Sequence, residues 1–240
     1  MKDDIRYYSR RTFINHSAIF GMAIISRPFH SFLTGMPGYD HFLLGCADLE
    51  NGIRFIKDRT GVEAVKGGKH PGIGTHNALI SLGDSVYLEI IAPDPGATSL
   101  NPEYSFLTEM QTPHLFYWAM HTSHIEDFRA QVLKMGYSHS AIQPGSRERK
   151  DGSMLKWKSM TITTPVEEGV PFFIEWDANS KHPSIDSPKG CSLKSFIVDS
   201  PHAGTLKTIF KKLGIAVKVS KQQKAGYHLT LKTPKGTVEL

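Results

Sequence analysis

Residues 40–61 read DHFLLGCADLENGIRFIKDRTG, the pattern of a β-strand that leads into an amphipathic helix. The strand is apolar from Phe42 to Cys46. The helix is predicted to begin after Asp48, to carry apolar side chains three and four residues apart, and to end at Gly61. A strand followed by such a helix is the first half of an α+β unit.

The same pattern recurs twice along the chain. Strand-like residues 115–120 and 193–198 precede predicted helices that begin after Ser123 and Ser200. Glu126 follows Ser123 by three residues and predicts a capping box. A strand and then a strand-turn-strand pair follow each helix, so each unit has the order β-α-β-β-β. The three predicted helix starts are 75 and 77 residues apart, which indicates three copies of one unit.

The repeat divides the chain into four parts. Residues 1–37 precede the first copy, and the copies occupy residues 38–112, 113–189 and 190–240. The third copy has no fourth copy to pair with. We therefore expect it to pack against the first two units or against a second subunit of a homodimer.

Residues 1–37 have the composition of an export signal. Five basic residues against two acidic ones give this segment +3 of the net charge of +5. Ser9-Arg10-Arg11-Thr12-Phe13 precedes an apolar run over 18–25, which is too short to span a bilayer and has the length of a signal-peptide core. The pattern resembles a twin-arginine signal. It predicts a periplasmic or other extracytoplasmic protein, and the alternative is a cytoplasmic protein with a loose N-terminal arm.

Charge and cysteine content exclude several classes of protein. With +3 assigned to residues 1–37, only +2 remains on the repeat region, scattered through turns and helix ends. This predicts no nucleic-acid partner and no stable membrane span. Cys46 and Cys191 form neither a zinc motif nor a disulfide framework. We expect Cys46 to be a buried thiol, and a single bridge between the two cysteines is the alternative.

The strands of the first unit have one face with polar side chains. Alternation places His41 on the face opposite Phe42. In the hairpin over 77–91, a turn centred on Gly83-Asp84 predicts that Glu89 lies opposite Ala78, which puts His76 and Tyr87 on the face of Glu89. A carboxylate among apolar neighbours is seldom buried unless it is paired or binds a cation.

The repeat predicts the corresponding positions of the second unit. Glu175 corresponds to Glu89, and a shift of 75 residues moves His41 to Phe116, with Trp118 and Met120 on the same face. The two units together would line a pocket with aromatic side chains and a few polar groups. That composition is typical of a small-molecule site.

The chain resembles the vicinal oxygen chelate superfamily of glyoxalases, extradiol dioxygenases and fosfomycin or bleomycin resistance proteins, and within it the glyoxalase-like subgroup. The motifs that carry the resemblance are Asp40-His41, Asp48-Leu49, residues 67–71, 74–79 and 87–91, Arg147, Asp151-Gly152, and residues 155–157 and 171–176. The resemblance implies an α+β fold in which two βαβββ units form an incomplete barrel around a metal ion or a ligand.

The resemblance also implies four metal ligands, from the first and last strands of each unit. His41, Glu89 and Glu175 occupy three of these positions, and Phe116 occupies the fourth. His76, His114, water or substrate would complete the coordination of Zn(II), Fe(II), Mn(II) or Ni(II). Without a metal, His41 is a core histidine and the two glutamates pair with basic residues such as Arg147, Arg149 or Lys158.

These observations predict a metal-dependent isomerase or lyase that acts on a small oxygenated compound. Glu175 or Glu89 would serve as the general base. Arg147 would bind a substrate carboxylate, unless it belongs to a solvated turn. The alternative is a non-catalytic protein that binds an aromatic or drug-like ligand over Phe116 and Trp118.

Overall fold

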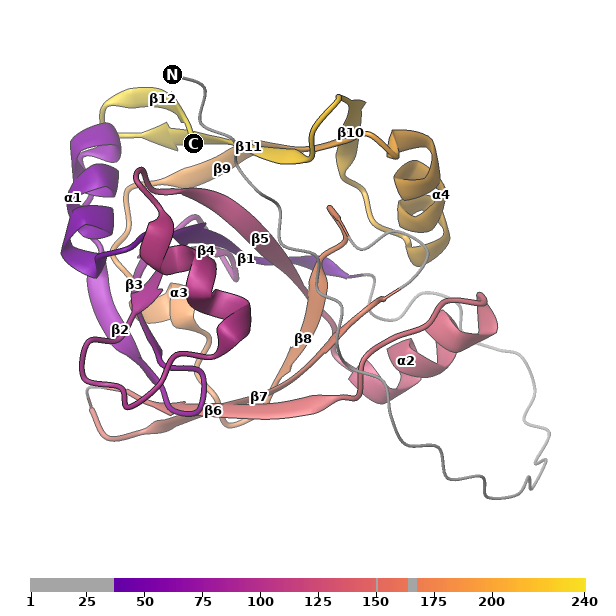
Figure 1. Ribbon diagram of the computed structural model, residues 1–240, viewed down its shortest axis with the longest axis horizontal. Helices are drawn as coiled ribbons and strands as arrows, with labels where there is room; N and C mark the ends of the chain where they lie inside the picture. Colours follow the sequence, from indigo (N-terminus) through magenta and orange to yellow (C-terminus); the bar gives the residue numbers. More distant parts are fainter. Residues whose placement is uncertain (1–36, 150, 164–167) are drawn as a thin grey trace.

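The computed structural model describes residues 37–149, 151–163 and 168–240, and arranges them in an eight-stranded sheet and a four-stranded sheet (Figure 1). Residues 1–36, and with them almost all of the predicted export signal, lie outside the described residues.

The first two units build the larger sheet. The elements of the first unit are β1 (Gly38–Gly45), α1 (Leu49–Thr60), β2 (Val65–His70), β3 (Thr75–Ser81) and β4 (Tyr87–Pro93). A 3-10 helix, η1 (Pro102–Glu109), leads to the second unit. Its elements are β5 (His114–His121), α2 (Ile125–Lys134), β6 (Gln143–Glu148), β7 (Met154–Thr161) and β8 (Phe172–Trp176).

The strand order is β2-β3-β4-β1-β5-β8-β7-β6, so the strands of the two units follow in the same order outward from the β1–β5 junction. In each unit the first strand pairs in parallel with the last, and β1 and β5 join the units in antiparallel fashion. The two edge strands, β2 and β6, lie close to each other. The evidence is that a Cβ built on Gly68 of β2 would lie 2.9 Å from the carbonyl oxygen of Glu148 in β6. The predicted incomplete barrel of tandem βαβββ units is confirmed.

The third unit has the predicted element order but a different strand pairing. Its elements are β9 (Ser192–Ser200), α4 (Ala203–Leu213), β10 (Lys218–Lys221), β11 (Gly226–Thr233) and β12 (Gly236–Glu239), after a short helix α3 (Pro183–Asp186). The order in its sheet is β10-β9-β11-β12, so β9 pairs in parallel with the strand after the helix and not with the last strand. The unit therefore cannot supply a third half-barrel.

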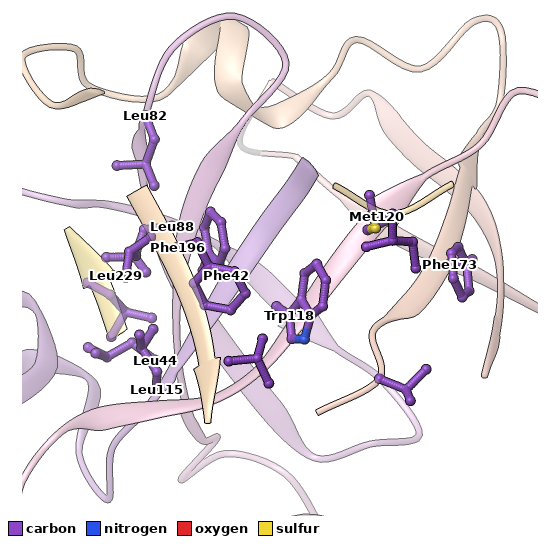
Figure 2. Close-up of a cluster of buried hydrophobic side chains, with 14 of the residues drawn as sticks. Phe42, Leu44, Leu82, Leu88, Leu115, Trp118, Met120, Phe173, Phe196 and Leu229 are labelled. Atoms are coloured by element: carbon purple, nitrogen blue, oxygen red, sulfur yellow. The ribbon is translucent and has the colours of Figure 1, made fainter. Parts of the chain in front are cut away.

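The main core lies between the barrel and the third unit. The outer face of β1 carries Phe42 and Leu44, as alternation predicted, and both are fully buried. Phe196 of β9 packs between Phe42 and Trp118, with ring centroids 4.7 and 5.0 Å away (Figure 2). The third unit thus covers the outside of the barrel.

Helix ends agree with the sequence for α1 and differ for α2. Asp48 caps α1 by accepting a hydrogen bond from the Asn51 amide at 2.8 Å, and Gly61 ends it with a left-handed conformation. For α2 the predicted capping box is wrong: the helix begins after His124, one residue later than expected, without a side-chain cap of its own.

Both cysteines are buried free thiols. Burial raises the pKa of Cys46 to about 12, so this thiol stays protonated at neutral pH. No helix among the described residues is long and apolar enough to cross a bilayer.

Candidate functional site

The hairpin of β3 and β4 decides which side chains face the inside of the barrel. Glu89 pairs with Leu79, and His76 pairs with Ala92, so the predicted register is wrong by one residue. The turn is longer than assumed: the Leu82 amide bonds to the Val86 carbonyl at 2.9 Å, and three residues lie between them. As a consequence Asn77, and not His76, shares the inner face with Glu89.

A β-bulge places Asp40 beside His41. Tyr39 pairs with Met120 and His41 with Ala119, so Asp40 has no partner on β5. The extra residue turns two successive side chains toward the same region. Asp40 is fully buried, and its Oδ1 lies 2.6 Å from Nδ1 of His41.

The hydrogen bond with Asp40 fixes which nitrogen of His41 is available. An ionised carboxylate only accepts, so Nδ1 of His41 donates to Asp40. Nε2 is left facing Glu89, 3.6 Å from its Oε2. The imidazole is stacked on Tyr87, with ring centroids 4.6 Å apart, and meets the edge of Phe172 at 5.3 Å. The ring is therefore held in one orientation with Nε2 toward the carboxylate.

Glu89 is buried and held by a second network. Its Oε1 accepts a hydrogen bond from Nδ2 of Asn77 at 2.7 Å. The same amide group lies 3.2 Å from Nε2 of His70, and Oδ1 of Asn77 accepts from the Gly68 amide. Burial lowers the pKa of His70, which keeps this imidazole neutral. Asn77 thus orients Glu89 so that only its Oε2 is directed at His41.

The outer oxygen of Asp40 is bound by residues from a different part of the chain. Its Oδ2 accepts from the indole nitrogen of Trp176 at 2.8 Å and lies 3.3 Å from Nε2 of His182. Burial opposes ionisation of Asp40, but hydrogen bonds from His182 and His41 together hold its pKa well below the usual value. Asp40 is consequently a charged carboxylate behind His41.

Arg147 is the buried cation of the inner face. It pairs with Leu155 of β7, and that face continues through Trp157 to Trp176. Its exposure is 6%, and burial lowers the pKa of its guanidinium while the charge of Glu89 raises it. The predicted binding residue Arg147 therefore lies near Glu89.

The structure does not bring Glu175 to His41 and Glu89. Its side chain lies on the opposite face of β8, where Oε2 accepts a hydrogen bond from the Ile125 amide at 2.6 Å, at the first turn of α2. The position that pairs as Glu89 does is Phe172: Glu89 pairs with Leu43 in the first unit, and Phe172 with Ala119 in the second. The predicted ligand set of His41, Glu89 and Glu175 is not assembled.

The aromatic residues expected from the second unit also shift by one position. Trp118 and Met120 belong to the outer core, where the Trp118 indole donates to the Gly169 carbonyl at 3.0 Å. Phe116 packs against Phe106 of η1. The shift arises because α2 begins at Ile125, 76 residues after the start of α1, so Tyr117 corresponds to His41.

The two additional histidines lie away from the inner network. His76 is on the other face of β3, beside Lys69 of β2. His114 is exposed and pairs with Gly45, at the opposite end of β1 from His41. Of the predicted site residues, His41, Glu89, Tyr87 and Arg147 are brought together.

The donor set does not fit a resident metal ion. Within the described ranges, no three His, Cys, Asp or Glu side chains are placed to hold one. His41 and Glu89 offer two donor atoms, but Tyr117 and Phe172 stand at the corresponding positions of the second unit. The orientation of His41 by Asp40 is one that metal-bound histidines share, and it equally suits a general base.

Both ends of the barrel are covered. Residues 177–190 cross the end where β1 begins: the Pro188 carbonyl accepts from the Ser81 amide, and Arg149 pairs with Asp186 at 2.6 Å. Leu107 of η1 packs against Gly45 at the other end. His41 and Glu89 are 3% and 7% exposed, so the site is nearly closed to water. The two surface hollows described lie elsewhere, beside Tyr137 and on the outer face of the small sheet.

Sequence reasoning missed the residues that orient the pair. Asp40, His70 and Asn77 were noted only as parts of motifs, and Trp176 and His182 were given no role. Adjacent Asp40-His41 in a strand was the available signal, because a bulge is one of the few ways for such neighbours to hydrogen-bond.

Comparisons with known proteins identify the domain. A family model described as a glyoxalase-like domain matches residues 39–214, which include the barrel except for the first residue of β1. A search of curated proteins finds no significant match.

Solved structures share the fold. A hypothetical protein from Staphylococcus aureus has a TM-score of 0.59 and 18% identity, covering 84% of this chain and 84% of that chain. Methylmalonyl-CoA epimerase from Mycobacterium tuberculosis has a TM-score of 0.42 and 19% identity, over 61% of this chain and 92% of that one. A hypothetical protein from Bacillus halodurans has a TM-score of 0.44 and 14% identity, over 60% and 96%. At 18% identity the likeness to the Staphylococcus aureus protein shows the fold alone.

Proposed function

The chain belongs to the family of proteins with a glyoxalase-like domain, and from this premise we propose that it is an enzyme that transfers a proton on a small oxygenated organic compound. The reaction is an isomerisation, and His41 is the general base. Glu89 is the second acid or base of the site.

One observation carries this proposal. Asp40 holds Nδ1 of His41 at 2.6 Å, and Nε2 of His41 faces Oε2 of Glu89 at 3.6 Å inside a nearly closed barrel. Both facing atoms are acceptors when the imidazole is neutral. The distance of 3.6 Å between Nε2 of His41 and Oε2 of Glu89 is longer than a hydrogen bond. It suits a substrate group that exchanges a proton with each of these two atoms.

The chemistry follows from this arrangement. Nε2 of His41 takes a proton from a carbon next to a carbonyl group, the C–H electron pair forms a carbon–carbon double bond, and the carbonyl π pair moves to the oxygen. The imidazolium that forms is stabilised by Asp40, whose charge is preserved by its other donors. Glu89 takes this proton from Nε2 of His41 and returns it to the substrate at a different position, so that both groups end in the protonation state in which they began. Burial excludes water that would compete for these steps.

The proposal is tested by hydrogen–deuterium exchange at carbon. The protein is incubated in D2O with pyruvate, hydroxyacetone or dihydroxyacetone, and loss of the C–H signal is followed by NMR. We expect exchange above the uncatalysed rate with at least one compound, and a fall of about 100-fold or more in His41→Ala and Glu89→Gln. His114→Ala, an exposed histidine outside the site, serves as control. Exchange that persists unchanged in His41→Ala contradicts the proposal.

Metal content is measured on the same preparations. Because no three His, Cys, Asp or Glu side chains of the described residues are placed to hold a metal ion, we expect well under one equivalent of Zn, Fe, Mn or Ni in protein purified without chelator. One equivalent that is lost in His41→Ala, together with exchange that a chelator abolishes, would add a divalent metal ion to the site.

We also propose that residues 1–37 direct export through the twin-arginine pathway. The support is the order of a Ser-Arg-Arg-Thr-Phe motif and a short apolar run. Fractionation of the native host should place the protein outside the cytoplasm, and Arg10→Lys combined with Arg11→Lys should retain it inside. Full-length protein found only in the cytoplasm would contradict the proposal.

A further inference from the structure

Arg147 is a buried cation whose ion pair is missing among the described residues. It is 6% exposed, yet no carboxylate in the described ranges lies within 4.0 Å of its guanidinium. By contrast Arg149, two residues further along the chain, pairs with Asp186 at 2.6 Å. Burying a guanidinium without a partner is destabilising in general, so an anion bound at Arg147 would compensate a cost that the described residues leave in place.

The nearest acidic side chain is already engaged. Glu89 contributes to the electrostatics of Arg147 but remains beyond ion-pair distance. Its Oε1 accepts from Asn77 and its Oε2 faces His41. Asp40, the other buried carboxylate of the site, has donors on both oxygens. Neither carboxylate therefore saturates the five N–H donors of Arg147.

The guanidinium is not fully enclosed by the described residues. No fully buried side-chain nitrogen or oxygen of the described residues lacks a hydrogen-bond partner. The side chain of Arg147 has no such bond with the described residues, so its N–H groups are accessible and not enclosed in packed protein. Gly68 of β2 leaves room for it: a Cβ there would lie 3.3 Å from Nη1 of Arg147.

We propose that Arg147 binds the carboxylate of an anionic substrate, which makes small 2-oxo or 2-hydroxy carboxylates the substrate class of the barrel site. The proposal rests on the proposed function for the location of the reacting carbon. A planar guanidinium presents parallel N–H groups that match the two oxygens of a carboxylate. The neighbouring cation Arg149 is paired with Asp186. A site with one unpaired arginine among the described residues suits a singly charged carboxylate better than a phosphate.

Binding is measured by titration calorimetry with three probes: pyruvate, its neutral analogue hydroxyacetone, and inorganic phosphate. We expect pyruvate to bind the wild type, and its affinity to fall about 10- to 100-fold in Arg147→Met. The affinity should fall less in Arg147→Lys, which keeps the positive charge but not the two parallel N–H donors of the guanidinium. Hydroxyacetone should bind weakly and equally to all three proteins. Arg129→Met, a substitution of a half-buried arginine that pairs with Glu126 on α2, should bind pyruvate as the wild type does.

Thermal unfolding provides a second readout that a merely structural arginine would not give. Replacing an unpaired buried charge by an apolar side chain of similar volume is often neutral or stabilising. Without ligand, Arg147→Met should therefore melt at the wild-type temperature or above it, while the pyruvate-dependent rise in Tm disappears.

Several results would overturn the inference: no pyruvate binding to the wild type, equal pyruvate binding in Arg147→Met, or phosphate binding as tight as pyruvate. Failure of the proposed reaction is distinguishable from these. His41→Ala should still bind pyruvate through Arg147, so binding that depends on Arg147 in a protein without carbon–deuterium exchange refutes the reaction and supports the carboxylate site.

Discussion

Two glycines lie in the turn between β2 and β3, and only one of them makes a close contact that constrains this part of the site. The turn between β2 and β3 carries Gly72 and Gly74, with φ of +84° and +82°. A Cβ on Gly74 would lie 2.1 Å from the carbonyl oxygen of Ser99, whereas a Cβ on Gly72 would meet nothing within 4 Å. The turn joins the strands that hold His70 and Asn77, so its geometry is transmitted to Glu89.

We expect Gly74→Ala to destabilise the protein by about 2–4 kcal/mol, because the left-handed conformation and the contact with backbone act together. This corresponds to a fall in Tm of roughly 5–12 °C for a chain of this size. Gly72→Ala is the matched control and should cost about 1 kcal/mol, from the conformation alone. Equal melting temperatures for the two variants would show that the Ser99 segment yields to the added methyl group.

The inner residues of the first unit were only partly predictable. Alternation correctly separated His41 from Phe42, because the period of a strand is fixed by its geometry. The choice between His76 and Asn77 depended on the length of one turn. A one-residue error there exchanges the two faces of a strand, and Ser85, with a positive φ of 58°, gives no strong sequence signal for a three-residue turn.

At the scale of elements, the side chain of Glu175 on β8 interacts with the N-terminal end of helix α2. Its carboxylate accepts the Ile125 amide at 2.6 Å, where the helix dipole favours negative charge. We expect Glu175→Ala to lower the free energy of unfolding by about 1–2 kcal/mol, with His41-dependent exchange retained. Ser123→Ala removes the predicted cap that does not form and should change stability by less than about 0.5 kcal/mol. Loss of exchange in folded Glu175→Ala would return Glu175 to the catalytic site.

The order of elements was easier to predict than their exact alignment. Helix periodicity and terminal glycines gave the β-α-β-β-β order of all three units, because burial of one helix face imposes that pattern. The repeat length could not reveal that α2 begins one residue later than Ser123 implied. That residue put Tyr117 inside the barrel and Trp118 outside. On β8 the difference is three residues, because Phe172 and not Glu175 pairs as Glu89 does.

The small sheet has a pH-sensitive contact across three strands. His228 lies 2.8 Å from Asp199 and 2.9 Å from Glu239, and hydrogen bonds to Glu239 and Asp199 raise its pKa. Because the folded pKa exceeds the unfolded value of about 6.5, the stabilisation is present at lower pH and lost as pH rises through the raised value.

The wild type should therefore melt about 1–3 °C above His228→Gln at pH 6 and at the same temperature at pH 9, a small effect because the pair is half exposed. A difference that stays constant between these pH values would contradict the role of protonation.

For the whole molecule, the third unit and the barrel share one core. Phe196 of β9 contacts the rings of Phe42 and Trp118 in the barrel (Figure 2). It is also stacked on Tyr227 of its own sheet. Such shared burial couples the unfolding of the two parts, because neither can lose its neighbour without exposing apolar surface. The third unit is thus a structural partner of the barrel that lies outside the barrel interior.

We expect Phe196→Ala to destabilise the protein by about 3–5 kcal/mol, a fall in Tm of roughly 10 °C, through the lost burial and the cavity left behind. Tryptophan fluorescence, which comes from Trp118, Trp157 and Trp176 on barrel strands, and far-ultraviolet circular dichroism should still report one transition at the same temperature, as cooperative unfolding requires. Ile185→Ala, at an apolar side chain that is 54% exposed, is the control and should leave Tm within about 2 °C. Two separated transitions in Phe196→Ala, the first without a change in tryptophan fluorescence, would mean that the third unit melts independently, and the barrel would then keep its closed site without it.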